Sequence, residues 1–279
     1  MRVYITGIEG QLGRTLARHW GSAAQVTGGD LPAVDITDPD GITAAIVAAR
    51  PDLVVHCAAL TDVDGCARDP ALAYRVNGHG TQNVAIACRQ AGAALLHIST
   101  NEVFGGADAR AYHEFDPPAP VNPYGFSKAA GEWFVRHLLD RFFIVRTAWL
   151  YAPGGRNFVH AIRSAAGGGR PLRVVTDEVA NPTYVEDLAA AIVRLAATGR
   201  YGIYHLTNAG VCSRYTFARR ILALTGHEEL PVTPILQAQW PRASTPPPFA
   251  PLENLCAAAL GITLRPWEEA LADYLTAHG

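Results

Sequence analysis

The fold is signalled by the sequence Val3-Tyr4-Ile5-Thr6-Gly7-Ile8-Glu9-Gly10-Gln11-Leu12-Gly13, an apolar run followed by a glycine-rich turn and a helical segment. Such a turn needs residues without a Cβ where it tightens and where a pyrophosphate approaches the backbone. The free N–H groups at the start of the next helix favour an anion. The spacing G-x-x-G-x-x-G differs from the usual G-x-G-x-x-G and would also suit a purely structural turn. Its place after a first strand favours a cofactor-binding turn.

The rest of the chain repeats the alternation that this first unit begins. Strands are expected at residues 3–6, 25–28, 53–57, 94–98 and 142–146, with helices at 12–20, 42–49, 71–91 and 124–139. Continuous apolar strands separated by helices predict an α/β protein with a Rossmann-type, doubly wound parallel sheet. Residues 1–150 would form an NAD(P)-binding domain.

Residues 151–279 are expected to form a smaller C-terminal substrate-binding lobe, with some segments returning to the first domain. Helices are expected at 156–166, 184–197, 214–224, 255–260 and 266–277, and short strands at 172–175 and 202–206. The segment 241–251 contains five prolines and should be irregular or extended.

Composition excludes several classes of function. The 279 residues include 23 Lys+Arg and 25 Asp+Glu, so a net charge of −2 argues against electrostatic binding to nucleic acid or to anionic membrane. No apolar run is long enough for a transmembrane helix, and no signal peptide is evident, so a cytoplasmic setting is expected. Five scattered cysteines without a C-x-x-C pair predict neither disulfides nor a metal site. Lys128 is the only lysine among the 23 basic residues.

A tyrosine and that lysine share one face of an expected helix, in Tyr124-Gly125-Phe126-Ser127-Lys128. The i,i+4 spacing brings their side chains together. A nearby ammonium would lower the pKa of the phenol and so make proton exchange with a substrate oxygen practicable. Ser99-Thr100 follow an expected strand at the sheet edge where ligands bind. Taken alone, each feature would also suit an ordinary helix surface or loop.

Asp30 lies 17 residues beyond Gly13, after the second expected strand. This is close to the spacing at which an acidic residue binds the adenosine ribose of a dinucleotide, although a solvated loop aspartate is equally compatible. Because no arginine directly follows Asp30, NAD(H) or dual use is favoured over strict use of NADP(H).

Taken together, these features resemble the extended short-chain dehydrogenase/reductases, and within them the dTDP-4-dehydrorhamnose reductase family. The resemblance covers most of residues 1–190 through motifs in the expected order. They are Gly7…Gly13, Ala58-Ala59-Leu60-Thr61-Asp62-Val63-Asp64, Val76-Asn77, Ser99-Thr100-Asn101-Glu102-Val103-Phe104, Tyr124…Lys128, Gly131-Glu132, Arg146-Thr147-Ala148-Trp149-Leu150-Tyr151, Asn157-Phe158 and Asp177…Pro182-Thr183.

The resemblance implies a role for each set of residues. The catalytic set would be Thr100, Tyr124 and Lys128, with Tyr124 giving a proton to the C4 oxygen of a sugar as hydride arrives from NADPH or NADH. The cofactor-binding set would be Gly7, Gly10, Gln11, Leu12, Gly13, Asp30, Asp35, Ile36, Ala58, Ala59, Thr61, Tyr124 and Lys128. The substrate-binding set would be Asn101, Glu102, Val103, Trp149 and Asn157. Asn77 would serve either as a water-relay group or as a helix-to-loop hydrogen bond.

Some residues depart from the family pattern. The family's S-T-D-Y is Ser99-Thr100-Asn101-Glu102 here, and an expected Arg-Pro pair is Thr245-Pro246, with Arg242 nearby. Acidic residues for a metal at a dimer interface are not evident, and the sequence leaves open whether the chain forms a homodimer.

The implied activity is reduction of the 4-keto group of a nucleotide-linked 6-deoxy sugar, dTDP-4-dehydrorhamnose to dTDP-rhamnose. The alternatives are a nucleotide-sugar 4-epimerase and a non-catalytic subunit resembling the methionine adenosyltransferase beta subunit. The intact set Thr100, Tyr124 and Lys128 argues against the non-catalytic alternative.

Overall fold

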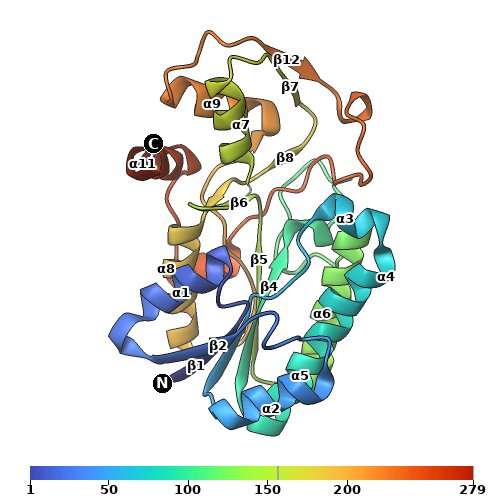
Figure 1. The fold of residues 1–279 in the computed structure, drawn as a ribbon, viewed down its shortest axis with the longest axis vertical. Coiled ribbons are helices and arrows are strands. Elements are labelled where there is room, and N and C mark those ends of the chain that lie inside the picture. The colour runs from blue at the N-terminus through green and yellow to red at the C-terminus, as the bar shows by residue number, and fades with distance from the viewer. Residues whose placement is uncertain (156, 279) are drawn as a thin grey trace.

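A computed structural model describes residues 1–155 and 157–278, which are built around a six-stranded sheet (Figure 1). Its order is β10-β5-β4-β3-β1-β2, and every neighbouring pair is parallel. The strands are β1 (Arg2–Thr6), β2 (Gln25–Gly29), β3 (Leu53–His56), β4 (Ala94–Thr100), β5 (Phe142–Thr147) and β10 (Gly202–His205). β2 pairs with one edge of β1, and the chain then crosses over so that β3 pairs with the opposite edge of β1. This confirms the predicted doubly wound sheet and places its switch point between β1 and β3.

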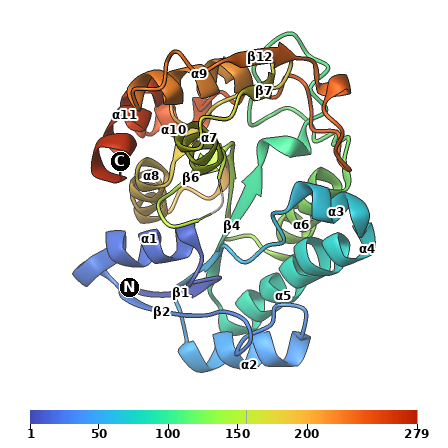
Figure 2. The ribbon, with the colours of Figure 1, turned by 45° about the horizontal axis from the view of Figure 1, so that its top comes forward.

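Helices cover both faces of the sheet, because each strand of the centre carries apolar residues on both sides (Figures 1 and 2). One face packs against α1 (Gln11–Trp20) and α8 (Val185–Thr198). The other packs against α2 (Pro39–Ala49), α5 (Thr81–Ala91) and α6 (Pro123–Leu138). Two apolar cores, one on each side of the sheet, therefore hold the strand ends in place.

The helix predicted over 71–91 is present as a continuous helical run with a π-helical middle, and a short helix precedes it. The region between β3 and β4 contains α3 (Val63–Arg68), α4 (Pro70–Ala73), a π-helical segment η2 (Tyr74–Gly80) and then α5. Asp69 ends α3 and caps α4 by accepting a hydrogen bond from the Leu72 nitrogen at 2.9 Å. The proline at position 70, which lacks an N–H, suits the first position of that new helix.

The second half of the chain adds a lobe beyond the carboxyl ends of the strands (Figure 2). Its helices are α7 (Phe158–Gly167), α9 (Arg214–Leu224), α10 (Leu255–Ala259) and α11 (Trp267–His278). Its short strands pair as β6 (Leu150–Tyr151) with β9 (Thr183–Tyr184), β7 (Leu172–Val175) with β12 (Val232–Ile235), and β8 (Val179–Ala180) with β11 (Cys212–Ser213). The helix predicted from residue 156 begins at Phe158, and Arg156 lies outside the described residues.

The segment predicted as a short strand at 202–206 lies in the main sheet, where β10 pairs with β5. The division at residue 150 remains a prediction; beyond it, α8 packs against the sheet and β10 forms one of its strands. The proline-rich segment 241–251 forms no helix, as predicted, and continues from β12 back toward α3 (Figures 1 and 2).

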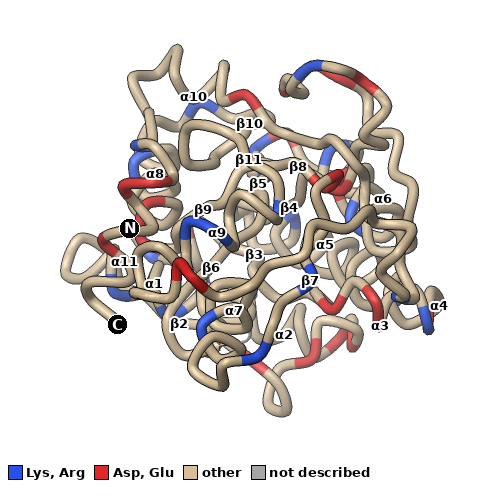
Figure 3. Tube along the Cα trace, turned by 90° about the horizontal axis from the view of Figure 1, so that it is seen from above, with Lys and Arg blue, Asp and Glu red and all other residues tan. Residues whose placement is uncertain are grey.

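Acidic and basic residues are interspersed over the whole trace (Figure 3). Within the described residues, no helix is long and apolar enough to span a membrane. The same residues contain no group of three or more His, Cys, Asp or Glu side chains suited to a metal ion, and the five cysteines are free thiols.

Candidate active site

The glycine turn joins β1 to α1 and is pressed against the end of β3. Gly7 has a φ of +71°, and a Cβ on it would lie 2.8 Å from the Ala58 nitrogen. A Cβ on Gly13 would lie 2.2 Å from the Gly7 carbonyl oxygen, so α1 could not pack on the turn with any larger residue there. Gly10 is the N-cap of α1 and provides no side-chain hydrogen bond to it. The turn thus combines close packing with a helix N-terminus suited to an anion.

Asp30 follows β2, and the fold brings it to this turn. Its Oδ2 accepts a hydrogen bond from the Glu9 nitrogen at 3.0 Å, and its Oδ1 accepts one from the Leu31 nitrogen at 2.9 Å. Asp35 accepts two hydrogen bonds from Thr37, at 2.8 and 2.9 Å. The Ile36 side chain is buried in the core beside α2 and α5. Of these predicted cofactor residues, Asp30 therefore makes the direct contact with the glycine turn.

The loop after β3 carries Ala58, Ala59 and Thr61, and Asn77 of η2 holds it in place. The Asn77 Oδ1 accepts from the Leu60 nitrogen at 2.8 Å, and its Nδ2 donates to the Leu60 carbonyl at 3.0 Å. The same amide donates to the Ser127 hydroxyl at 3.0 Å. Asn77 therefore forms the helix-to-loop hydrogen bond, one of the two roles considered for it.

Tyr124 and Lys128 lie in the first turns of α6, which begins where Asn122 caps it by accepting from the Gly125 nitrogen at 2.8 Å. Lys128 is only 3% exposed, and its Nζ donates to the Ile98 carbonyl of β4 at 2.7 Å. Burial lowers the pKa of Lys128 to about 8, although nearby Glu132 acts in the opposite direction. The ammonium is thus anchored at the carboxyl end of β4, where Thr100 also lies.

The phenol of Tyr124 has a different electrostatic setting from the predicted one. Burial raises its pKa above the ordinary value, the carboxylate of Glu102 raises it further, and an interaction with the Thr100 side chain lowers it. The expectation of a lowered pKa was wrong for this arrangement, because desolvation of a phenolate dominates and the Lys128 ammonium is directed at a backbone carbonyl. Tyr124 is therefore held in the protonated form at neutral pH.

Residues 101–103 form the short helix η3 directly after β4. Glu102 accepts a hydrogen bond from Asn122 Nδ2 at 2.7 Å, and Asn101 Nδ2 donates to the Ala250 carbonyl at 3.1 Å. Both line a small cleft beside Trp149. The Val103 side chain is buried in a separate apolar cluster, so of these three predicted substrate residues only the side chains of Asn101 and Glu102 reach the cleft.

A cavity of about 610 Å³ in the C-terminal lobe adjoins that cleft, and both Trp149 and Asn157 line it. The guanidinium of Arg214 stacks on Trp149, with its carbon 3.7 Å from the ring centroid, and lies 4.9 Å from the centroid of Phe158. The Asn157 amide caps α7 and donates to the Ala152 carbonyl at 2.8 Å. The cavity is largely apolar, with a cation at the end nearest the cleft.

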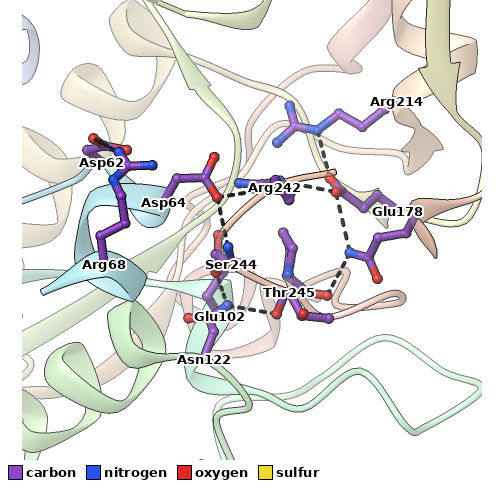
Figure 4. Close-up of polar contacts among 12 residues, drawn as sticks. Asp62, Asp64, Arg68, Glu102, Asn122, Glu178, Arg214, Arg242, Ser244 and Thr245 are labelled. Atoms are coloured by element: carbon purple, nitrogen blue, oxygen red, sulfur yellow. Dashed lines mark hydrogen bonds and ion pairs between the residues drawn. The ribbon is translucent and has the colours of Figure 1, made fainter. Parts of the chain in front are cut away.

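A charged cluster next to the cleft was not predicted from the sequence (Figure 4). Glu178 accepts from Arg214 Nε at 3.2 Å and from Arg242 Nη1 at 3.4 Å, and Arg242 Nε donates to Asp64 at 3.0 Å. The Ser244 nitrogen also donates to Asp64, at 2.9 Å. These contacts join α3 to the proline-rich segment, which lies 178 residues further along the chain. Asp64, in the motif of residues 58–64, and Arg242, close to Thr245-Pro246, were both noted in the sequence. No pattern along the chain indicated that these two residues would pair.

Comparisons with known proteins agree with this geometry. The family model described as "RmlD substrate binding domain" matches residues 1–279. A dTDP-4-dehydrorhamnose reductase of Mycobacterium tuberculosis is 41% identical over 288 residues, which cover 99% of this chain and 93% of the relative. The crystal structure of dTDP-4-dehydrorhamnose reductase from Bacillus anthracis in complex with NADP has a TM-score of 0.95 at 37% identity and covers 99% of both chains. A UDP-glucose 4-epimerase from Thermus thermophilus, at 24% identity and a TM-score of 0.85, shares the fold.

Proposed function

Because this chain belongs to the RmlD substrate binding domain family, we propose that it is an NAD(P)H-dependent reductase of a nucleotide-linked 4-keto-6-deoxy sugar, converting dTDP-4-dehydrorhamnose to dTDP-rhamnose. The observation that carries the proposal is the convergence of Thr100, Tyr124 and Lys128 at one sheet edge. Thr100 interacts with the Tyr124 phenol, Lys128 bonds the Ile98 carbonyl of β4, and Glu102 of the adjoining η3 lines the cleft beside the cavity.

The residues of the sheet edge fit a dinucleotide. The uncapped start of α1 and the close-packed glycines offer backbone N–H groups to a pyrophosphate. Asp30 offers a carboxylate to the adenosine ribose, and Lys128 offers an ammonium to the nicotinamide ribose. When bound, the reduced nicotinamide supplies the hydride.

Side chains of the protein supply the proton and bind the C4 carbonyl oxygen of the sugar. Tyr124 donates the phenolic proton to the C4 oxygen; it is protonated before the reaction, although its raised pKa makes it a weaker acid than a free phenol. Thr100 can donate a hydrogen bond to the same oxygen and favour the developing negative charge. Lys128 ties α6 to β4 through its bond to the Ile98 carbonyl and so helps to position the Tyr124 phenol.

The adjoining cavity supports a nucleotide-linked substrate. Arg214 and Arg242 line both the cavity and the cleft, where Glu178 pairs with both of them; their remaining guanidinium N–H groups could bind the diphosphate of such a molecule. Trp149 and Asn157, from the predicted substrate set, line the same cavity. Glu102 and Asn101 would face the sugar, and Val103 would contribute only through its backbone.

The test is turnover of dTDP-4-dehydrorhamnose by the purified protein with NADPH and with NADH. The expected result is stoichiometric loss of reduced nicotinamide together with formation of dTDP-rhamnose. Interconversion of sugar epimers without net loss of reduced cofactor would identify an epimerase instead. Absence of both reactions, with the cofactor bound, would refute the proposal and favour a non-catalytic role.

A further inference from the structure

Glu132 is a buried carboxylate that the proposed chemistry does not use. It lies one helical turn beyond Lys128 on the sheet-facing side of α6, and the two residues are only 2% and 3% exposed. Residues four apart on a helix are neighbours on its surface. A charged side chain is rarely buried to this degree unless it is fully paired, so its partners reveal its role.

Three hydrogen bonds hold the Glu132 carboxylate in a single orientation. Arg146 donates through Nε to Oε1 at 2.9 Å and through Nη2 to Oε2 at 2.6 Å, and Ser99 Oγ donates to Oε1 at 2.6 Å. Ser99 and Arg146 are register partners on β4 and β5. Because Ser99 directly precedes Thr100, these bonds fasten α6 to the strand that carries the third catalytic residue.

Lys128 provides a second attachment between the same two elements through its bond to the Ile98 carbonyl. Two adjacent turns of α6 are therefore pinned to the last residues of β4. This arrangement sets how far the Tyr124 phenol stands from the Thr100 hydroxyl, and displacements of about 1 Å at such a site cost up to about a hundredfold in rate.

Among the charges around Lys128, Glu132 is the nearby anion that favours its ammonium form. Burial lowers the pKa of His56 on β3 to about 3 and that of His97 on β4 well below its usual range, so both are neutral. Burial raises the pKa of the Cys57 thiol, after β3, to about 12, so it is neutral too. Of the charged groups on the packed elements, Glu132 favours the ammonium, and its carboxylate is itself paired with Arg146 on β5.

The remaining neighbours of this helix face act elsewhere. η2 contributes the uncharged Asn77, whose amide bonds Ser127. Glu102 of η3 and Cys66 of α3 act on the phenol of Tyr124. Neither Glu102 nor Cys66 contributes to the charge balance at Lys128.

We infer that Glu132 is a positioning residue for this reaction, which fastens the Tyr124–Lys128 helix to β4 and maintains Lys128 as an ammonium. The inference rests on the proposed reductase function, through Lys128. Ser99 and Arg146 act with it by holding the carboxylate in place.

The test compares pH profiles of kcat/KM for the wild type and for Glu132→Gln. Because Glu132→Gln leaves a buried arginine without its anion, the double variant Glu132→Gln/Arg146→Met, which removes both charges, is measured beside it. The alkaline limb should reflect Lys128, whose pKa is near 8. Loss of the Glu132 carboxylate in Glu132→Gln should shift this limb of the kcat/KM profile to lower pH by about half to one unit. The loss of activity should therefore be larger at alkaline than at slightly acid pH.

Two further variants separate charge from structure. Glu132→Asp keeps the anion, so its alkaline limb should stay at the wild-type pH even if turnover falls. Glu269→Gln removes an exposed carboxylate of α11 and should leave the profile unchanged. A uniform loss of activity at every pH in the Glu132→Gln and double variants would overturn the inference, because it would mean that Glu132 only supports the fold.

A readout that does not need turnover keeps this inference distinct from the proposed function. The affinity for NADPH, followed against pH by fluorescence, should fall at a lower pH in Glu132→Gln than in the wild type. A wild type without reductase activity would refute the proposed function, whereas an identical pH dependence of NADPH affinity in both proteins would refute the role of Glu132.

Discussion

Lys128→Arg should inactivate the protein although it keeps the positive charge. Arginine supplies 22 of the 23 basic residues of this chain, so composition alone would favour it here as well. The side chain at position 128 is almost fully buried and ends in a 2.7 Å bond to the Ile98 carbonyl. A planar guanidinium is larger than an ammonium, so it cannot bring an N–H group to the position that Nζ of Lys128 occupies.

The magnitude follows from these contacts. Adding volume to a packed interior costs about 1–3 kcal/mol. Loss of a charged hydrogen bond costs about 1.5–3 kcal/mol, part of which other guanidinium donors would recover. We therefore expect a loss of about 2–4 kcal/mol in the free energy of unfolding, which lowers Tm by about 5–10 °C in a chain of this size. Turnover should fall at least about a hundredfold, the contribution expected of a positioned acid–base system.

The assay combines thermal denaturation, NADPH binding and turnover for Lys128→Arg and for Lys128→Met. Methionine has a similar length and no charge, so it should fit the site with a smaller fall in Tm than arginine, yet be equally inactive. Wild-type turnover in Lys128→Arg would refute the reasoning, since any cation would then serve. An unchanged Tm in Lys128→Arg would show that the site accommodates a guanidinium.

Three other substitutions test separate parts of the site. Tyr124→Phe should lower kcat by about 10²–10⁴-fold while the NADPH affinity measured by fluorescence stays close to that of the wild type, and near-normal turnover would exclude Tyr124 as proton donor. Asp30→Ala removes the acceptor of the Glu9 nitrogen and the proposed ribose contact. It should change the NADH/NADPH ratio of kcat/KM about tenfold in favour of NADPH, the value of one hydrogen bond, and an unchanged ratio would leave Asp30 only a turn-stabilising role. Arg242→Ala breaks the 3.0 Å pair with Asp64 and removes a guanidinium from the cleft, so the KM for the sugar nucleotide should rise about tenfold with NADPH affinity unaffected; an unaltered KM would count against substrate contact by Arg242.

Local patterns predicted those parts of the fold that local physics controls. The strand before Gly7, the glycine turn and the helix after it were predictable because backbone conformation and side-chain periodicity are properties of neighbouring residues. The same holds for the shared helix face of Tyr124 and Lys128, which follows from their spacing. The helix predicted over 71–91 is present, but its π-helical middle, Tyr74–Gly80, was not predicted.

The remaining features depend on contacts between distant parts of the chain. Asp64 and Arg242 meet across 178 residues, and no periodicity relates them. The raised pKa of Tyr124 is a consequence of burial in the folded chain and of the nearby Glu102 of η3, and it is opposite to the effect expected from the neighbouring lysine. Residue types and spacings along the chain thus specify which groups are available for chemistry and which strand ends carry them. The protonation of those groups and their partners follow from desolvation and long-range packing, which exist only once the chain has folded.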